Sequence, residues 1–385
     1  MKRPVILGGP PAFLEPLPFA RPFTPPLADV VCRLEPSYER GMLTNGSLVE
    51  DQAARRLGMD HVVAVSSCTT GLMLTLQALD PCGPGLLPSF TFSASAHAIA
   101  WNGLRPVFRV RPVLVPGRHR PPRREGPRRR SHSRHPRVRG AMRHRAPGSA
   151  GRSAGIPLVF DAAHALGASR DGRPVGRFGA AEVFSLSPTK LVMGGEGGLV
   201  ATADAAPAER LRTAHDYGNP GEYDTRFVGL NGRMSELHAA VALASLDLLD
   251  EHLRRRRSLA ERHRDGLAQV PGIALQLVNA NDRSTFKDCT VAVDPAGFGL
   301  SRDALVQALW AEGIDTRCYF FPPVHRQQAY AHLEPAHLPV TDDVAGRVVS
   351  LPLFARLTPA AVDQTVEALV ALHEHADEAD AVAVT

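Results

Sequence analysis

Short apolar runs alternate along the chain with longer stretches in which apolar residues recur every three or four positions. The short runs, rich in β-branched residues, predict strands, and the stretches with helical spacing predict helices. The predicted strands are 61–66, 86–88, 106–108, 157–161, 182–185, 198–203, 289–293 and 316–319. The predicted helices are 27–34, 48–57, 72–79, 93–102, 205–215, 234–259, 302–312 and 359–376. Because strands alternate with helices, we expect an α/β fold with a mostly parallel sheet sandwiched by helices.

The same pattern divides the chain into three parts. Residues 1–47 are rich in proline and weakly periodic, which predicts an N-terminal arm. A large domain is expected over 48–260, and a smaller C-terminal α/β domain over 271–385, where the spacing of the elements changes. A length of 385 residues is sufficient for two or three domains with buried cores.

Composition excludes several classes of protein. The five cysteines are scattered and odd in number, which argues against both a disulfide framework and a Cys-x-x-Cys metal site. No stretch of the sequence approaches the roughly 18 apolar residues of a membrane span. The apolar run at 5–7 is too short for a signal peptide. We therefore expect a soluble, cytoplasmic protein that holds no metal and does not bind a membrane.

The net charge of +5 comes from one segment. Residues 109–153 hold fifteen arginines and one glutamate, whereas the rest of the chain has 29 basic and 38 acidic residues. The segment consists almost only of Arg, Pro, Gly, Ala, Ser, His and Val, which GC-rich codons yield in a shifted reading frame. We favour out-of-frame translation; the alternatives are a basic arm that binds nucleic-acid phosphates and a long solvated loop. Because unpaired guanidinium groups cannot be buried, we expect 109–153 to be poorly ordered.

Lysine is rare in this chain and marks a candidate site. Of the 44 basic residues only three are lysines, namely Lys2, Lys190 and Lys287. Lys190 follows Ser-Pro-Thr and precedes the Gly-Gly-Glu-Gly-Gly run at 194–198. A Schiff base needs a primary amine that can lose its proton, which arginine cannot supply. Lys190 is therefore a candidate for covalent chemistry, with a solvated surface lysine as the alternative.

Two further features precede Lys190. Asp161 ends a predicted strand, at the edge where parallel sheets bind ligands, and a carboxylate there can hold a pyridinium N–H. The Ser-Ser-Cys-Thr-Thr-Gly turn at 66–71 leads into a helix, and helix N-termini attract anions. Taken singly, both features are also explained as helix N-caps. Together, a phosphate cradle, a strand-end aspartate and a lysine in this order predict a pyridoxal phosphate (PLP) site.

Six motifs then resemble, in order, the DegT/DnrJ/EryC1/StrS family of PLP-dependent sugar aminotransferases. The motifs are VVAVSSCTTGLMLTLQAL, PSFTFSASAHAIAWNGLRPVF, IPLVFDAAHALGA, VFSLSPTKLVMGGEGGLV, VGLNGRMSELHAA and GIDTRCYFFPPVHRQQAY. They cover nearly the whole chain apart from 109–153, where the family has a strand, a helix and a second strand. The resemblance implies the type I fold of aspartate aminotransferase, with a large PLP-binding domain and a smaller C-terminal domain.

The resemblance also implies a role for each matching residue. Lys190 would be joined to the cofactor and would later move a proton, and Asp161 would pair with the ring nitrogen. The other residues implied to contact PLP are Phe92 on the ring face, His164 at the ring hydroxyl, Thr69, Thr70 and Ser185 at the phosphate, and Asn231 at the phosphate of a neighbouring subunit. Asn231 is alternatively a turn former. Tyr319 and His325 are assigned to the substrate by position alone.

The activity implied is transfer of an amino group from L-glutamate to a nucleotide-linked keto sugar, a dTDP-4-keto-6-deoxyhexose, in antibiotic or cell-surface sugar biosynthesis. A homodimer with shared active sites is implied, and a lysine at 190 argues against the dehydratase branch of the family, which has histidine there. The alternatives are a keto-cyclitol aminotransferase of the scyllo-inosose type, and a chain left as an inactive relic by its 109–153 segment. A nucleic-acid binder using the basic segment is the alternative from another class of protein.

Overall fold

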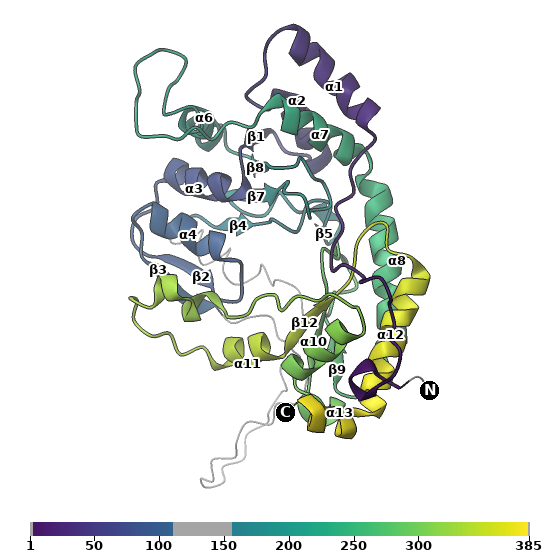
Figure 1. Ribbon diagram of the computed structural model, residues 1–385. Coiled ribbons are helices and arrows are strands. Elements are labelled where there is room, and N and C mark those ends of the chain that lie inside the picture. The colour runs from purple at the N-terminus through teal and green to yellow at the C-terminus, as the bar shows by residue number, and fades with distance from the viewer. Residues whose placement is uncertain (1–2, 111–155, 384–385) are drawn as a thin grey trace.

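Helices and strands alternate through much of the chain in the computed structural model, which describes residues 3–110 and 156–383 (Figure 1). The helices are α1 (Leu27–Glu39), α2 (Ser47–Leu57), α3 (Cys68–Leu79), α4 (Ser93–Trp101), α6 (Ala205–Ala214), α7 (Glu236–Asp247), α8 (Leu249–Leu267), α9 (Pro295–Phe298), α10 (Arg302–Ala311), α11 (Pro339–Arg347), α12 (Pro359–Glu374) and α13 (Ala376–Ala383), with short 3-10 helices at Val5–Leu7, Val324–Arg326 and Gln328–Tyr330. The strands are β1 (His61–Val65), β2 (Gly85–Pro88), β3 (Pro106–Val110), β4 (Val159–Asp161), β5 (Ser169–Arg170), β6 (Arg173–Pro174), β7 (Ala181–Ser185), β8 (Gly198–Thr202), β9 (Ile273–Leu275), β10 (Asp282–Arg283), β11 (Cys289–Val293) and β12 (Val348–Leu351). The prediction of poor order for the Arg-rich segment falls, from residue 111 on, outside the described residues.

The central sheet has the strand order β1-β8-β7-β4. β4 runs parallel to β7, and β2 and β3 form a separate parallel pair, whereas β8 is antiparallel to both β7 and β1. The short connection between β7 and β8 contains no helix in which the chain could cross over, so the two strands pair antiparallel. The predicted α/β class is confirmed, and the sheet of the described residues is mixed.

Both faces of this sheet are covered by helices. Along β1, Val62 and Ala64 point into an apolar cluster shared with α2 and α7, while Val63 and Val65 point into a second cluster shared with α3 and α6. Successive side chains of a strand face opposite sides, so a run that is apolar at every position is buried on both. Figure 1 shows the sheet between these helices.

The C-terminal part contains a second sheet with the order β12-β11-β9, in which β11 pairs antiparallel with both neighbours. α10 and α12 supply apolar residues to the cluster beneath it, and α8 packs along α12. The predicted division into parts at 1–47, 48–260 and 271–385 stays a prediction.

Two sequence predictions are wrong in this half of the chain. The helix expected over 234–259 is two helices, α7 and α8, because the chain changes direction at Leu248: α7 packs on α1 and α2, whereas α8 packs on α12. The strand expected over 316–319 makes only a single bridge, between Arg317 and Ser350, because the chain turns where Phe321 N–H donates to the Cys318 carbonyl. Apolar spacing alone reports neither a change of partner nor a turn.

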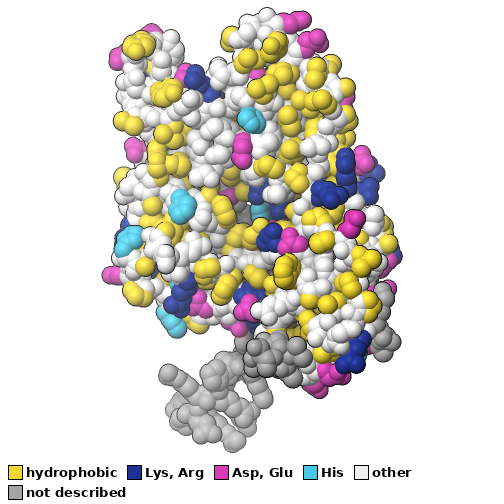
Figure 2. Space-filling model, viewed as in Figure 1, with side chains coloured by type: hydrophobic (Ala, Val, Ile, Leu, Met, Phe, Trp, Pro, Cys, Tyr) yellow, Lys and Arg dark blue, Asp and Glu magenta, His cyan; other side chains and the backbone are white. Residues whose placement is uncertain are grey.

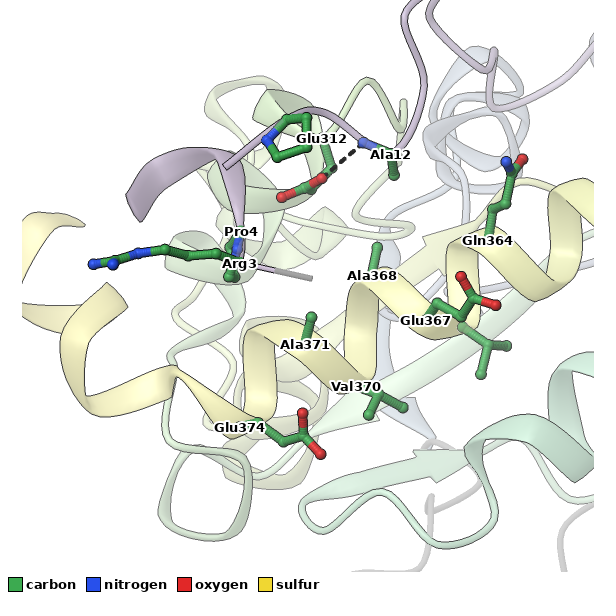
Figure 3. A pocket seen from close by; sticks show the side chains of 12 residues that line it. Arg3, Pro4, Ala12, Glu312, Gln364, Glu367, Ala368, Val370, Ala371 and Glu374 are labelled. Carbon is green, nitrogen blue, oxygen red and sulfur yellow. Dashed lines mark hydrogen bonds between the residues drawn. The ribbon is translucent and has the colours of Figure 1, made fainter. Parts of the chain in front are cut away.

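The N-terminal segment packs against the C-terminal part. The buried carboxylate of Glu312 accepts the N–H of Val5 at 2.7 Å and of Ala12 at 2.9 Å. A cavity of about 320 Å3 lies between this segment and α12, and no predicted site residue lines it (Figure 3). In the described ranges, no helix has the length and apolar character needed to cross a bilayer.

Candidate active site

Lys190 lies in the connection between β7 and β8, beyond the C-terminal end of β7 in the central sheet. Its N–H donates to the Ser187 carbonyl at 3.0 Å, and the base of the turn is closed by a bond from Leu186 N–H to the Gly197 carbonyl at 2.9 Å. Gly197 has a φ of +139°, and a Cβ there would lie 2.5 Å from Cε of Met234. Glycine is therefore needed at 197 for the turn to hold Lys190 against the sheet.

The surroundings of Lys190 favour its neutral amine. Burial, first, and the nearby cation of Lys287, next, lower the pKa of Lys190 to about 8 in all, against the opposing effects of Cys68, Asp288 and Asp161. Asp161 is among the charges that act on Lys190, so the strand-end aspartate, apart in sequence, lies in the surroundings of the lysine. A lysine with a pKa near 8 is suited to nucleophilic and proton-transfer work, unlike a solvated surface lysine.

Asp161 ends β4 and is fixed by two hydrogen bonds. Its Oδ2 accepts the hydroxyl of Ser95, on α4, at 2.5 Å, and its Oδ1 accepts the N–H of Ala163 at 3.2 Å. A turn follows Asp161, so in this structure it does not cap a helix. Ser95 was missed by sequence reasoning, because nothing local in α4 indicates that its first turn faces β4.

The turn before α3 has the geometry of an anion cradle. Ser67 is the N-cap of α3, and its Oγ accepts the N–H of Thr70 at 3.0 Å and lies 2.9 Å from the Thr70 hydroxyl. Ser66 N–H donates to the Gly232 carbonyl at 2.7 Å, which ties the cradle to the turn that carries Asn231. The N–H groups of a helix's first turn lack intrahelical partners and favour an anion. Thr69 and Thr70 thus stand where a phosphate would bind.

Ser185 and Asn231 border this region differently. The buried Ser185 ends β7, and its hydroxyl donates to the Ser187 hydroxyl at 3.2 Å, beside the turn of Lys190. Asn231 forms a bridge with Asp216 and is exposed, so it is not turned into this chain's own core.

His164 lies beside Lys190 and is held from the C-terminal half. Its Nδ1 is 3.7 Å from Oδ2 of Asp288, and its carbonyl accepts the Thr285 hydroxyl at 2.7 Å. The surrounding protein and the cation of Lys190 keep the pKa of His164 well below its usual value, which favours the neutral imidazole. Sequence reasoning gave no role to Lys287 or Asp288; the rarity of lysine was the one signal available.

The two aromatic residues predicted for the site, Phe92 and Tyr319, each lie against another ring. Phe92, 59% exposed, lies with its ring centroid 6.4 Å from that of Phe320, and Tyr319 lies 5.7 Å from Phe19. The exposed ring of Phe92 is free to cover a planar group.

His325, assigned to the substrate by position, is enclosed. Its ring is only 2% exposed, with Nδ1 2.6 Å from the Ser89 hydroxyl and Nε2 3.1 Å from Asp342. In this structure the ring of His325 therefore contacts protein groups on both sides.

The residues brought together fit PLP. The aldehyde of this cofactor matches a lysine with a lowered pKa, and its ring nitrogen matches an anchored carboxylate. Its ring face matches an exposed aromatic ring, and its phosphate matches a hydroxyl-rich helix N-terminus.

Comparison with known proteins agrees with this chemistry. The profile of the DegT/DnrJ/EryC1/StrS aminotransferase family matches residues 31–109 and 149–370, and the gap between these ranges falls within the Arg-rich segment. A UDP-N-acetyl-3-dehydro-alpha-D-glucosamine 3-aminotransferase of Acidithiobacillus ferrooxidans is 33% identical over 81% of this chain and 84% of its own length. A dTDP-3-amino-3,4,6-trideoxy-alpha-D-glucose transaminase of Streptomyces venezuelae is 34% identical over 83% of this chain and 85% of its own.

A solved structure shares the fold over almost the full length. DesI, solved in the presence of its TDP-sugar product, superposes with a TM-score of 0.84 at 31% identity, covering 97% of each chain. The inactive-relic alternative finds no support in these comparisons.

Proposed function

Because the chain belongs to the DegT/DnrJ/EryC1/StrS aminotransferase family and is a PLP-dependent aminotransferase, we propose that it moves the amino group of L-glutamate to a nucleotide-linked keto sugar, specifically a dTDP-4-keto-6-deoxyhexose. The observation that carries the proposal is the meeting of Lys190, with its lowered pKa, and the anchored carboxylate of Asp161. The names of the relatives support a sugar nucleotide as acceptor. A role in deoxyaminosugar biosynthesis, for antibiotics or cell-surface polysaccharides, follows from that substrate.

The chain's own residues divide the work. PLP, when bound, supplies an aldehyde that joins an amine and a ring that withdraws electrons. Asp161, oriented by Ser95, would hold the proton on the ring nitrogen, and Phe92 would cover the ring face. Neutral Lys190 takes and returns the proton at the reacting carbon, as a general base near its own pKa does.

The test combines trapping with turnover. Borohydride reduction of the holoenzyme, followed by peptide mass spectrometry, is expected to place the cofactor on Lys190, and Lys190→Ala is expected to abolish transamination while it retains part of the cofactor binding. Glutamate is then offered with dTDP-4-keto-6-deoxyglucose or with scyllo-inosose. Amination of the cyclitol alone would overturn the sugar assignment, and an adduct elsewhere in the chain would overturn the site.

We also propose that two copies form the working enzyme, with Asn231 of each serving the phosphate site of the other. Asn231 is exposed, and the loop after α6 that leads to it extends away from the body (Figure 1). Hydrophobic side chains gather on the upper part of the molecule over α1 (Figure 2), where Leu27, Val31 and Tyr38 are exposed. Exposed apolar groups on one helix are typical of a protein interface, and a second copy is the occupant that would bring Asn231 to a phosphate.

Subunit mixing tests this arrangement. Lys190→Ala and Asn231→Ala each lose activity alone, but a mixed dimer carries one site with both native residues if Asn231 acts across the interface. Each mixed dimer is therefore expected to have about half of the native activity, and an equimolar mixture with free subunit exchange about a quarter, since half of its dimers are mixed. Absence of recovery, with subunit exchange verified by two affinity tags, would mean that Asn231 acts within its own chain.

A further inference from the structure

Residues 284–288, here called the Lys287 strap, cross from the C-terminal part to the site. Arg256 of α8 donates to the carbonyls of Phe286 at 3.0 Å and Lys287 at 2.6 Å, and Thr285 bonds the carbonyl of His164. The strap is thus fixed at both ends, to α8 and to the turn after Asp161.

The strap places a buried cation in the site. Lys287 is 7% exposed, and its ammonium lies 2.7 Å from Oδ1 of Asp288, whose other oxygen faces His164. A buried ammonium is costly unless it is paired, and Asp288 supplies that pair. Because Asp288 occupies the ammonium, Lys287 is poorly placed to bind the substrate and acts through its charge.

Lys287 and Lys190 line the same pocket. Its volume of about 20 Å3 leaves room for about one water molecule. Two ammonium groups at such a pocket cannot both be hydrated as in bulk solvent, so their repulsion is only weakly screened. Asp288 holds the ammonium of Lys287 in this position, so its positive charge acts on Lys190 across the pocket.

We propose that Lys287 is a positioning residue whose buried charge raises the fraction of Lys190 that is in the neutral, nucleophilic form. The inference rests on the proposed function, since it concerns the lysine assigned to carry PLP. Asp288 has a double part: it holds the ammonium of Lys287 and faces Nδ1 of His164.

The charges that face Lys190 from each element determine whether a substitution raises or lowers the pKa of Lys190. Burial acts first, and the cation of Lys287 next, both against the ammonium form. Cys68 on α3, Asp161 on β4 and Asp288 on the strap favour the ammonium form. His164 is neutral, and buried Arg256 stands behind the strap as a further cation. Removing Lys287 is therefore expected to raise the pKa of Lys190, and neutralising Asp288 to lower it.

The experiment measures the protonation of Lys190 in the apoprotein, without turnover. Trace acetic anhydride labels neutral amines, and mass spectrometry follows labelling of Lys190 against pH, with N-acetyl-lysine amide in the same tube as reference. For each unit by which the pKa of Lys190 rises, Lys287→Met is expected to lower its labelling rate at pH 7 about tenfold. Lys287→Arg should keep most of the native rate, and Asp288→Asn should raise it.

Opposite shifts in the two strap variants separate an electrostatic role from a structural one. Arg302→Met is the matched control, because Arg302 is likewise a buried cation paired with the aspartate that follows it, but lies outside the site. Its labelling curve for Lys190 is expected to match that of the native protein. Shifts in the same direction in both strap variants, or an unchanged curve in Lys287→Met, would overturn the inference. Failure of borohydride to trap PLP on native Lys190 would overturn the proposed function instead.

Discussion

At the scale of single residues, the site depends on side chains that hold the reacting groups. Asp161 and Ser95 are 66 positions apart, yet the hydroxyl of Ser95 donates to Oδ2 of Asp161 at 2.5 Å. With the second carboxylate oxygen bound to Ala163 N–H, rotation of the carboxylate is restricted. Hydrogen bonds to charged groups contribute about 1.5–3 kcal/mol each, so loss of one donor is measurable.

Ser95→Ala is therefore expected to weaken PLP binding about ten- to a hundredfold, because the carboxylate loses its hydroxyl donor and its fixed direction. Fluorescence titration of the apoprotein with PLP measures this. Ser93→Ala, in the same turn of α4, is the control and should bind PLP as the native protein does. Equal affinity of both variants would show that Ser95 does not orient Asp161.

At the scale of elements, helix α3 joins stability to cofactor binding. Ser67 caps α3 through the N–H of Thr70, and the same helix start is the anion cradle. Asp204 caps α6 in the same manner, by accepting the N–H of Ala206 at 3.1 Å, but α6 carries no site residue. The two caps therefore form a matched pair.

Ser67→Ala and Asp204→Ala are each expected to lower the free energy of unfolding of the apoprotein by about 1 kcal/mol. Only Ser67→Ala should also weaken PLP binding, since it removes one of the two hydroxyl partners of Thr70, leaving Ser66, and loosens the cradle. Urea unfolding and PLP titration of both variants measure the two effects. If Asp204→Ala also lost affinity for PLP, the weaker binding would come from the lower stability of the protein and not from the cradle at α3.

At the scale of the whole molecule, buried histidines couple folding to pH. Burial lowers the pKa of His215 and of His263 to about 4 from the usual 6.5. His263 of α8 lies 3.2 Å from the Pro352 carbonyl, between α8 and the C-terminal sheet. Both histidines are neutral in the folded chain at pH 5, whereas the unfolded chain is protonated.

The contribution of these two histidines to the free energy of unfolding is therefore fully present above pH 6.5. It is expected to fall as the pH drops toward 4, by roughly 3 kcal/mol for each histidine. Urea unfolding of the apoprotein at successive pH values measures the slope. His263→Gln should make the free energy of unfolding depend less steeply on pH, by the equivalent of about one proton taken up on unfolding. His332→Gln, at an exposed histidine, should leave this pH dependence as in the native protein. An unchanged slope in His263→Gln would place the acid sensitivity elsewhere.

The sequence alone determined the α/β class, most helices and strands, and the order of cradle, aspartate and lysine, because each of these depends on local spacing of residue types. A β-branched run predicted a strand at 61–66, where the structure has β1. The scarcity of lysine pointed to Lys190, which is half-buried and feels the charge of Asp161. The break at Leu248 could not be predicted, because apolar spacing continues while the packing partner changes.

The tertiary structure alone decided which distant groups meet. Ser95 against Asp161, and the Lys287 strap against His164, are contacts between segments far apart in sequence, for which spacing along the chain gives no signal. It also decided that the ring of His325 is enclosed rather than open to a ligand. The protonation of Lys190 belongs to this second group, since burial and the charges of neighbouring elements set it, and both arise only when the chain has folded.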